Sequence, residues 1–299
     1  MATMKKIYID SRFAQGHGSD FTVELPETVN CGPDTVAYVT DVCFPIAWNT
    51  IDVHKSKIFM LEKRSPDFPV QARVIEIPIR DYTLGSALVQ EVQTALNLNG
   101  PSLAARKNVI RSYAVAFNQN TFALTVNLTG GGQFTILSFN QLRDFYYHSR
   151  WKFLATQSFA IVVQLDPSFY YDRLNPKTAN GVLRIGLGEG DIYTLGTTMV
   201  GGSIDLRPVH TIYLTSPNFS NNDVLGPNGG LRNTIRRIAI TEPTKGLQYN
   251  EHSGHSEDYI SCGGMSLKTL RFILKDSFGN VVTLNGGHCA FSILFAERP

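Results

Sequence analysis

Apolar and polar residues alternate with a period of two along most of this chain, which is the pattern of half-buried β-strands. Near the amino end, Phe21, Val23 and Leu25 alternate with polar residues, and we expect Pro26 to end this strand. The segment 36–44 is rich in β-branched and aromatic residues and stops before a proline. It predicts a second strand.

The carboxyl third shows the same pattern even more clearly. Five of its segments predict strands: 210–215, 234–240, 270–275, 281–284 and 289–295. Between the third and the fourth of these, Asp276–Asn280 predicts a turn in which Gly279 adopts a positive φ. Because almost no residues follow the last strand, we expect that strand to lie inside a sheet.

The middle of the chain contains shorter strand patterns and a single helical one. The strand patterns are 58–61, 74–77, 113–118, 122–128 and 134–137, of which the third and fourth predict a hairpin. Apolar residues recur every four positions at Leu84, Leu88, Val92 and Leu96. This spacing predicts one amphipathic helix, capped by Thr83 and ended within 97–101.

Many short strands separated by Gly-, Pro- and Asn-rich turns predict a mainly β fold of the sandwich or jelly-roll type. The strand patterns are strongest at the two ends of the chain. We therefore expect a single jelly-roll β-sandwich built from both chain ends, residues 1–69 and 201–299. Residues 70–200 are expected to form a β-rich inserted subdomain that carries the amphipathic helix.

Composition narrows the classes of partner. Of the 299 residues only 17% are charged, against roughly 25% in average proteins, and the chain holds 18 Phe and 12 Tyr. Two interpretations fit: a surface that largely meets other protein, or one large core beneath an uncharged polar surface. The net charge of +2 predicts no specific attraction to nucleic acid. No run of about 20 apolar residues predicts a transmembrane segment, and no signal peptide is recognised, so we expect synthesis in the cytosol.

Candidate reactive and metal-binding residues are few. The four cysteines, Cys31, Cys43, Cys262 and Cys289, form no C-x-x-C pair, and we expect free buried thiols without zinc. Cys289 alternates with apolar residues on the last strand, so burial should raise its pKa and make it a poor nucleophile.

Three further patterns bear on chemistry. His252 and His255 could share a metal only on a helix, and Gly254 favours a polar loop. The glycines of 186–190 precede no helix, so a phosphate-binding turn is not expected. No G-x-S-x-G motif marks a serine hydrolase. We therefore predict no catalytic residue, no metal, no cofactor and no enzyme activity.

Two clusters could contact other molecules. Arg232, Arg236 and Arg237 form the one compact basic group, but neighbouring residues of a strand point to opposite faces, which favours ion pairs over a phosphate groove. The aromatic segment Phe145–Trp151 could stack on bases or sugars, although packing within or between subunits is the simpler interpretation.

Five blocks of sequence resemble the penton, or minor capsid, proteins of Polinton-like viruses and virophages, and they occur in that family's order. The blocks are Tyr8–Phe13 with Ser19–Pro26, Ala37–Ile51, Tyr82–Thr83 with the helix, Gly202–Asn218, and Leu270–Leu284 with Gly287–Ile293. The resemblance implies a single jelly roll that forms homopentamers at the fivefold vertices of an icosahedral capsid. It also implies contacts with the major capsid protein of the same virus, a virion location and no catalytic residues.

Alternative functions remain open on the sequence. A receptor- or carbohydrate-binding β-sandwich of a virion spike is favoured by the aromatic, Asn-rich segments 145–151 and 216–233. In a penton, the insertion 70–200 could bind a host receptor. A cupin-like enzyme needs histidines on adjacent strands, whereas most histidines here are expected in loops. A major capsid protein with two jelly rolls needs roughly twice the length of a single-sandwich domain.

Overall fold

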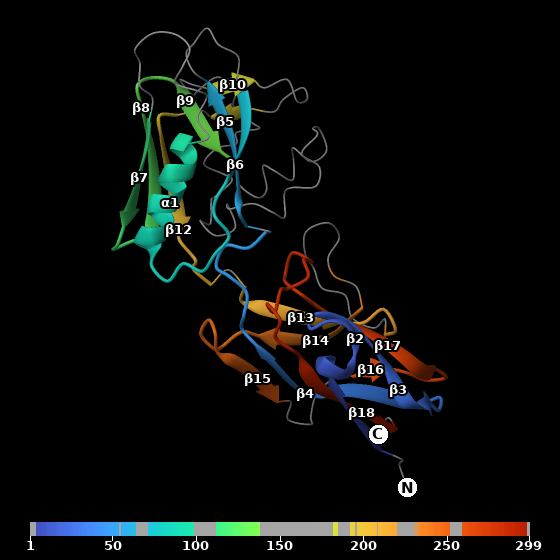
Figure 1. Ribbon diagram of the computed structural model, residues 1–299. Helices are drawn as coiled ribbons and strands as arrows, with labels where there is room; N and C mark the ends of the chain where they lie inside the picture. Colours follow the sequence, from blue (N-terminus) through green and yellow to red (C-terminus); the bar gives the residue numbers. More distant parts are fainter. Residues whose placement is uncertain are drawn as a thin grey trace. The chain divides into compact units, whose positions relative to one another are not determined.

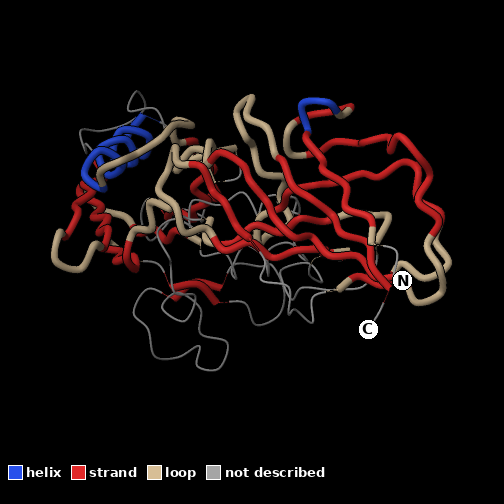
Figure 2. Tube along the Cα trace, turned by 90° about the horizontal axis from the view of Figure 1, so that it is seen from below, coloured by secondary structure: helices blue, strands red, loops and turns tan. Residues whose placement is uncertain are grey.

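In the computed structural model the chain is mainly β, with several sheets and, among the residues described, one α-helix (Figures 1 and 2). The residues described are 4–53, 55–63, 71–98, 112–137, 182–184, 192–194, 196–207, 209–219, 231, 233–251 and 259–297. The chain divides into two compact units. The end unit comprises Met1–Trp48 and Val209–Pro299, and the middle unit comprises Asn49–Pro208.

The end unit contains two five-stranded sheets in which every neighbouring pair is antiparallel. Sheet A has the order β1 (Lys5–Asp10), β18 (Ala290–Glu297), β4 (Thr35–Pro45) and β15 (Leu247–Glu251), with β16 (Ile260–Ser261) also paired to β4. Sheet B has the order β14 (Thr234–Ala239), β13 (Thr211–Thr215), β17 (Ser266–Lys275), β3 (Asp20–Asn30) and β2 (Gln15–His17). A short 3₁₀ helix, η1 (Ser11–Phe13), follows β1. Each sheet therefore contains strands from both ends of the chain (Figure 1).

The core of the end unit lies between the two sheets. Period-two alternation turns one side of each strand inward, and these side chains form one buried apolar cluster. Its centre is aromatic: the ring centroids of Phe272 on β17 and Phe291 on β18 lie 4.8 Å apart, edge to face. Phe21 on β3 lies 5.9 Å from the first ring and 6.3 Å from the second. The two sheets thus pack through residues from both chain ends.

Two irregularities interrupt the strand register. Ser292 on β18 pairs with Asp41 but Ile293 pairs with Val39, so Thr40 is an extra residue in β4, a β-bulge. In β3 the register against β17 shifts between Glu24 and Val29. The second shift contains the proline at position 26.

The middle unit has its own sheets and core. One sheet has the order β6 (Gln71–Glu76), β5 (Lys57–Lys63) and β9 (Gln133–Ile136), and another has the order β12 (Thr198–Ser203), β8 (Ala123–Thr129) and β7 (Ser112–Asn118). A further pair joins β10 (Val182–Arg184) to β11 (Ile192–Thr194). A second buried apolar cluster, separate from that of the end unit, contains side chains from both three-stranded sheets and from the helix.

The helix α1 (Gly85–Leu98) covers the outer edge of β7 with side-chain amides. Asn97 accepts a hydrogen bond from the backbone N–H of Tyr113 and donates one to its carbonyl, both at 2.9 Å. One turn earlier, Gln93 accepts a bond from the N–H of Val115 at 2.8 Å. An edge strand leaves backbone groups unpaired, so these two amides take the place of a neighbouring strand.

The sequence predicted the helix and the 113–118/122–128 hairpin, and the structure confirms both. Leu88, Val92 and Leu96 are buried on one helix face. However, the helix begins at Gly85, so Thr83 is not its cap, and Leu84 is exposed. In the hairpin, β7 and β8 pair from Ser112 with Thr129 to Asn118 with Ala123.

Two strand predictions were wrong in detail. We expected Pro26 to end its strand, but β3 continues to Asn30, because the register shift there removes the need for a backbone N–H at the proline. We expected a strand over 281–284, but only one isolated bridge, Lys275 with Val281, forms there. The rest of the segment is a loop, in which the backbone N–H of Val282 donates to the carbonyl of Leu274 at 3.0 Å.

The contacts place the boundaries between the units at different positions from those expected. Strand β5 falls within the segment 1–69 that the sequence assigned to the sandwich. It pairs with β6 and β9, so the contact boundary lies at 48/49 rather than 69/70. At the other end it lies at 208/209 rather than 200/201, because β12 pairs with β8.

Candidate functional site

Most sequence-predicted candidates for binding or chemistry lie outside the described residues. These are Phe145–Trp151, 186–190, His252, His255 and Arg232. Of the segment 216–233, the structure describes 216–219, 231 and 233; within it Phe219 is fully buried in the core. The observations that favoured a carbohydrate-binding module therefore receive no structural test.

Arg236 and Arg237 can be placed, and they do not act together. Arg236 on β14 is buried, and its Nη2 donates a hydrogen bond to Oδ1 of Asn250 on β15, 2.8 Å away. Arg237 lies on the exposed face of the same strand. The Arg236 guanidinium thus links sheet B to sheet A. Arg236 and Arg237 do not form a single groove for phosphate.

The four thiols are free, and three of them are buried. Burial raises the pKa of Cys289 far above its usual range, and it raises the pKa of Cys262 to about 12. For Cys43, which is half-buried, partial burial and then the charge of Asp41 raise the pKa. Thiols held protonated in this way are weak nucleophiles and weak metal ligands.

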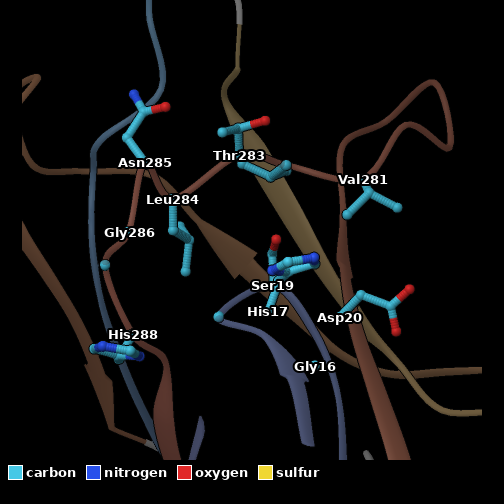
Figure 3. Close-up of a pocket in the computed structure, with 13 residues that line it drawn as sticks. Gly16, His17, Ser19, Asp20, Val281, Thr283, Leu284, Asn285, Gly286 and His288 are labelled. Carbon is cyan, nitrogen blue, oxygen red and sulfur yellow. The ribbon is translucent and has the colours of Figure 1, made fainter. Parts of the chain in front are cut away.

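A surface hollow of about 540 Å³ lies in the end unit between the β2–β3 turn and the loop before β18. Figure 3 shows the turn Gly16–Asp20 surrounded by an arc formed by Val281–His288. The two segments approach at backbone distance, because a Cβ built on Gly18 would lie 2.1 Å from the carbonyl oxygen of Gly287. This hollow therefore depends on a glycine at the tip of the turn.

The polar residues of the hollow do not converge on a common point. His17 and His288 lie apart in the close-up (Figure 3). Asp20 forms an ion pair with Arg271, with Oδ2 and Nη2 separated by 2.8 Å, and this hydrogen-bonded pairing lowers the pKa of Asp20. Within the described ranges, no three His, Cys, Asp or Glu side chains are grouped so as to hold a metal. We see no arrangement for catalysis in this hollow.

The outer face of sheet A has a polar centre at the β-bulge. Side chains that alternate with the core residues point to this face, and the register aligns Tyr8, Ser292, Asp41 and Glu251 in one row across the four strands. The Ser292 hydroxyl donates a hydrogen bond to the Asp41 carboxylate. The Thr40 hydroxyl donates a second one, 3.0 Å long, to the same carboxylate.

This polar centre stabilises the ionised form of Asp41. Partial burial opposes its ionisation, but the hydroxyl donors and Lys6, whose Nζ lies 3.5 Å away, outweigh burial and lower the pKa of Asp41. The bulge supplies the Thr40 hydroxyl to this centre. A persistent negative charge therefore sits in the middle of the face.

Large exposed side chains lie on the two edge strands of sheet A. On β1, Tyr8 is 77% exposed. On β15, Leu247 is 62% exposed and Tyr249 is 56% exposed. In Figure 1, β15 lies at the margin of its sheet beside β4. Each margin of sheet A thus carries one exposed tyrosine, a residue type that is enriched where proteins contact one another.

The alternation of apolar and polar residues carries a signal for these exposed side chains. In Lys5–Asp10, Tyr8 lies between Ile7 and Ile9, so strict alternation already assigns it to the side opposite the core. On β15, Gln248 and Asn250 point towards the core, so alternation assigns Tyr249 between them to the outer face as well. That both strands are edges of one sheet depends on pairing between distant segments, which alternation does not reveal.

The comparisons with known proteins found matches among solved structures. No family model matches the chain, and no curated protein matches it significantly. The chain is similar in structure to the selenomethionine-labelled mavirus penton protein, whose crystal structure it matches over 100% of both chains. The TM-score is 0.46 and the sequence identity is 10%. Separately, no helix among the described residues is long and apolar enough to cross a membrane.

Proposed function

We propose that this chain is a viral structural protein, the penton (minor capsid) subunit that forms pentamers at the fivefold vertices of an icosahedral capsid. The observation that supports the fold required for this role is the strand order of the end unit. In chain order its eight principal strands are β1, β3, β4, β13, β14, β15, β17 and β18. The first, eighth, third and sixth are neighbours in sheet A, and the fifth, fourth, seventh and second are neighbours in sheet B. This order supports a single jelly roll, the eight-strand fold of many capsid proteins.

The position of the middle unit also fits a jelly roll with an insertion. Residues 49–208 enter between the third strand, β4, and the fourth, β13. Both chain ends therefore remain in the sandwich, while the insertion leaves from a single connection. We propose that the inserted unit is free to carry a separate task, such as binding a host receptor.

A jelly roll alone does not assign function, because lectins and cupins share it. The choice among them rests on the sequence blocks that resemble penton proteins. Those blocks include Tyr8–Phe13, Ala37–Ile51 and Leu270–Leu284, which contain parts of β1, β4 and β17. The residues shared with pentons thus lie on the strands that build the proposed jelly roll. We accordingly propose an assembly role rather than an enzymatic one.

The proposed partners are other copies of this chain and the major capsid protein of the same virus, in the virion. The test is negative-stain imaging of the purified full chain. Fivefold rings of uniform diameter are the expected result. Single particles of one chain, or rings of another symmetry, at the highest concentration at which the chain stays soluble would contradict the proposal.

A further inference from the structure

The two margins of sheet A are open to another strand. β1 pairs with β18 alone, and β15 pairs with β4 alone, among the strands that the structure describes. The backbone N–H and C=O groups on the outer margin of each strand therefore have no strand partner among the described residues. Such an edge is a template for pairing with another chain. In contrast, the β7 edge in the middle unit is covered by the amides of Gln93 and Asn97.

The directions of the two edge strands suit a repeat of the sheet. All neighbours in sheet A are antiparallel, and two strands separate β1 from β15, so these edges run in opposite directions. If a second copy continues the sheet in the same orientation, its β1 lies antiparallel to the β15 of the first copy. The new pair then has the same sense as every pair already in the sheet.

The charges of the two edges suit pairing of unlike edges. The β1 edge carries exposed Lys5 and Lys6 at its amino end, whereas β15 carries exposed Glu251 and no cation. Opposite charges placed across two strands stabilise the pair. A closed ring of five copies, as in the proposed function, uses a head-to-tail contact in which each copy offers β1 to one neighbour and β15 to the other.

One register of this pair places outer-face side chains opposite one another and also sets unlike charges together. Side chains on the outer face must pair with outer-face side chains, which aligns Lys6 and Tyr8 with the set Leu247, Tyr249 and Glu251. Placing Tyr8 opposite Tyr249 brings Lys6 opposite Glu251, because in an antiparallel pair the residue numbers fall along one strand as they rise along the other. In this register an aromatic pair and a pair of opposite charges lie next to each other on the outer face.

We propose that β1 of one copy pairs antiparallel with β15 of the next copy, with Tyr8 opposite Tyr249 and Lys6 opposite Glu251. This inference rests on the proposed function and specifies the interface that closes its ring. The contact is heterologous, so each copy uses one edge for each neighbour. Sheet A then continues from copy to copy around the ring.

A charge exchange tests the pairing. Lys6→Glu and Glu251→Lys each place like charges together at every interface, while the double variant restores opposite charges. Replacing attraction by repulsion in one cross-strand pair is worth about fivefold in affinity. Because a closed ring of five repeats this change at every interface, the concentration at half-assembly should rise about sevenfold in each single variant. In the double variant it should fall back below both single variants, and it should stay somewhat above the wild-type value because Lys6 also pairs with Asp41 of its own chain. Glu76→Lys, the same change at an exposed residue of the middle unit, should leave assembly unchanged.

A disulfide test reports the register directly. In a Cys43→Ser background, the double variant Tyr8→Cys with Tyr249→Cys places two thiols in directly opposed positions, whose Cα separation of about 4.5–5.5 Å suits a disulfide. Oxidation should give a covalent ladder that ends at five chains. The single cysteine variants should give no ladder, and Tyr8→Cys with Leu247→Cys should crosslink far less.

The outcomes separate this inference from the proposed function. Wild-type pentamers whose assembly is unaffected by both charge reversals, or whose double variant does not fall below both single variants, would overturn the edge pairing and leave the penton proposal standing. The same applies if the opposed cysteines form no ladder. A wild-type chain that stays monomeric would overturn both. A dimer that persists when only one edge is altered would show a twofold contact and would also overturn the pairing.

Discussion

Coupling between two phenylalanines tests whether both chain ends share one core. Phe21, near the amino end, and Phe291, near the carboxyl end, are 1% and 2% exposed, and their ring centroids lie 6.3 Å apart. Truncating either to alanine should cost about 3–5 kcal/mol of unfolding free energy, from lost burial and the cavity left behind. The double variant should cost less than the sum by about 0.5–1.5 kcal/mol, the value of an aromatic pair in contact.

The assay is urea unfolding followed by tryptophan fluorescence. The chain has two tryptophans, so a Trp151→Phe background leaves Trp48, a member of the same core cluster, as the reporter of the end unit. The control pair combines Phe21→Ala with Phe134→Ala, because Phe134 belongs to the separate core of the middle unit. Control costs should add within about 0.5 kcal/mol. Additive costs for Phe21 and Phe291 as well would refute the shared core.

Three further predictions concern local features. Gly18→Ala should destabilise the chain by about 1–3 kcal/mol in thermal or urea unfolding, because the added Cβ would collide with backbone atoms. In the control Gly32→Ala the nearest atom to the added Cβ lies 3.6 Å away, so this variant should cost far less. Equal costs for the two variants would contradict the close approach at Gly18. Asn97→Ala should cost about 1–3 kcal/mol and expose the β7 amides to hydrogen exchange, and unchanged protection would count against the amide cap. The hydrogen-bonded Arg271 lowers the pKa of Asp20 below its usual 3.8, so this pair stabilises the fold above about pH 4 and the stabilisation is lost as the pH falls below that. Asp20→Asn should therefore lower stability at pH 7 by at most about 1 kcal/mol, with the difference from wild type vanishing near pH 2; a constant difference would argue against the pair.

Local sequence patterns were sufficient for elements whose partners are close in the chain. The four-residue spacing of Leu88, Val92 and Leu96 predicted the helix, because only a helix brings these side chains to one face. The 276–280 turn formed as predicted, and Gly279 has a φ of 86°. The prediction of a mainly β fold with one helix is likewise confirmed over the residues that the structure describes.

Features that depend on distant partners were not predictable in the same way. The bulge at Thr40 exists because β4 pairs with β18, some 250 residues away, and no local pattern marks it. The edges that expose Tyr8 and Tyr249 are edges only because of the order of the strands in sheet A. Likewise, the prediction that the strand ends at Pro26 was wrong because the register shift that accommodates this proline depends on the pairing of β3 with the distant β17.

Native mass spectrometry of the wild-type chain tests the central claim most directly. The chain has a mass of 33.1 kDa, so a closed ring of five copies has a mass of about 166 kDa. We expect that species to dominate, with dimers to tetramers scarce because only the closed ring satisfies both edges of every copy. A spectrum that shows only the single chain, or an even-numbered assembly built on dimers, would contradict it.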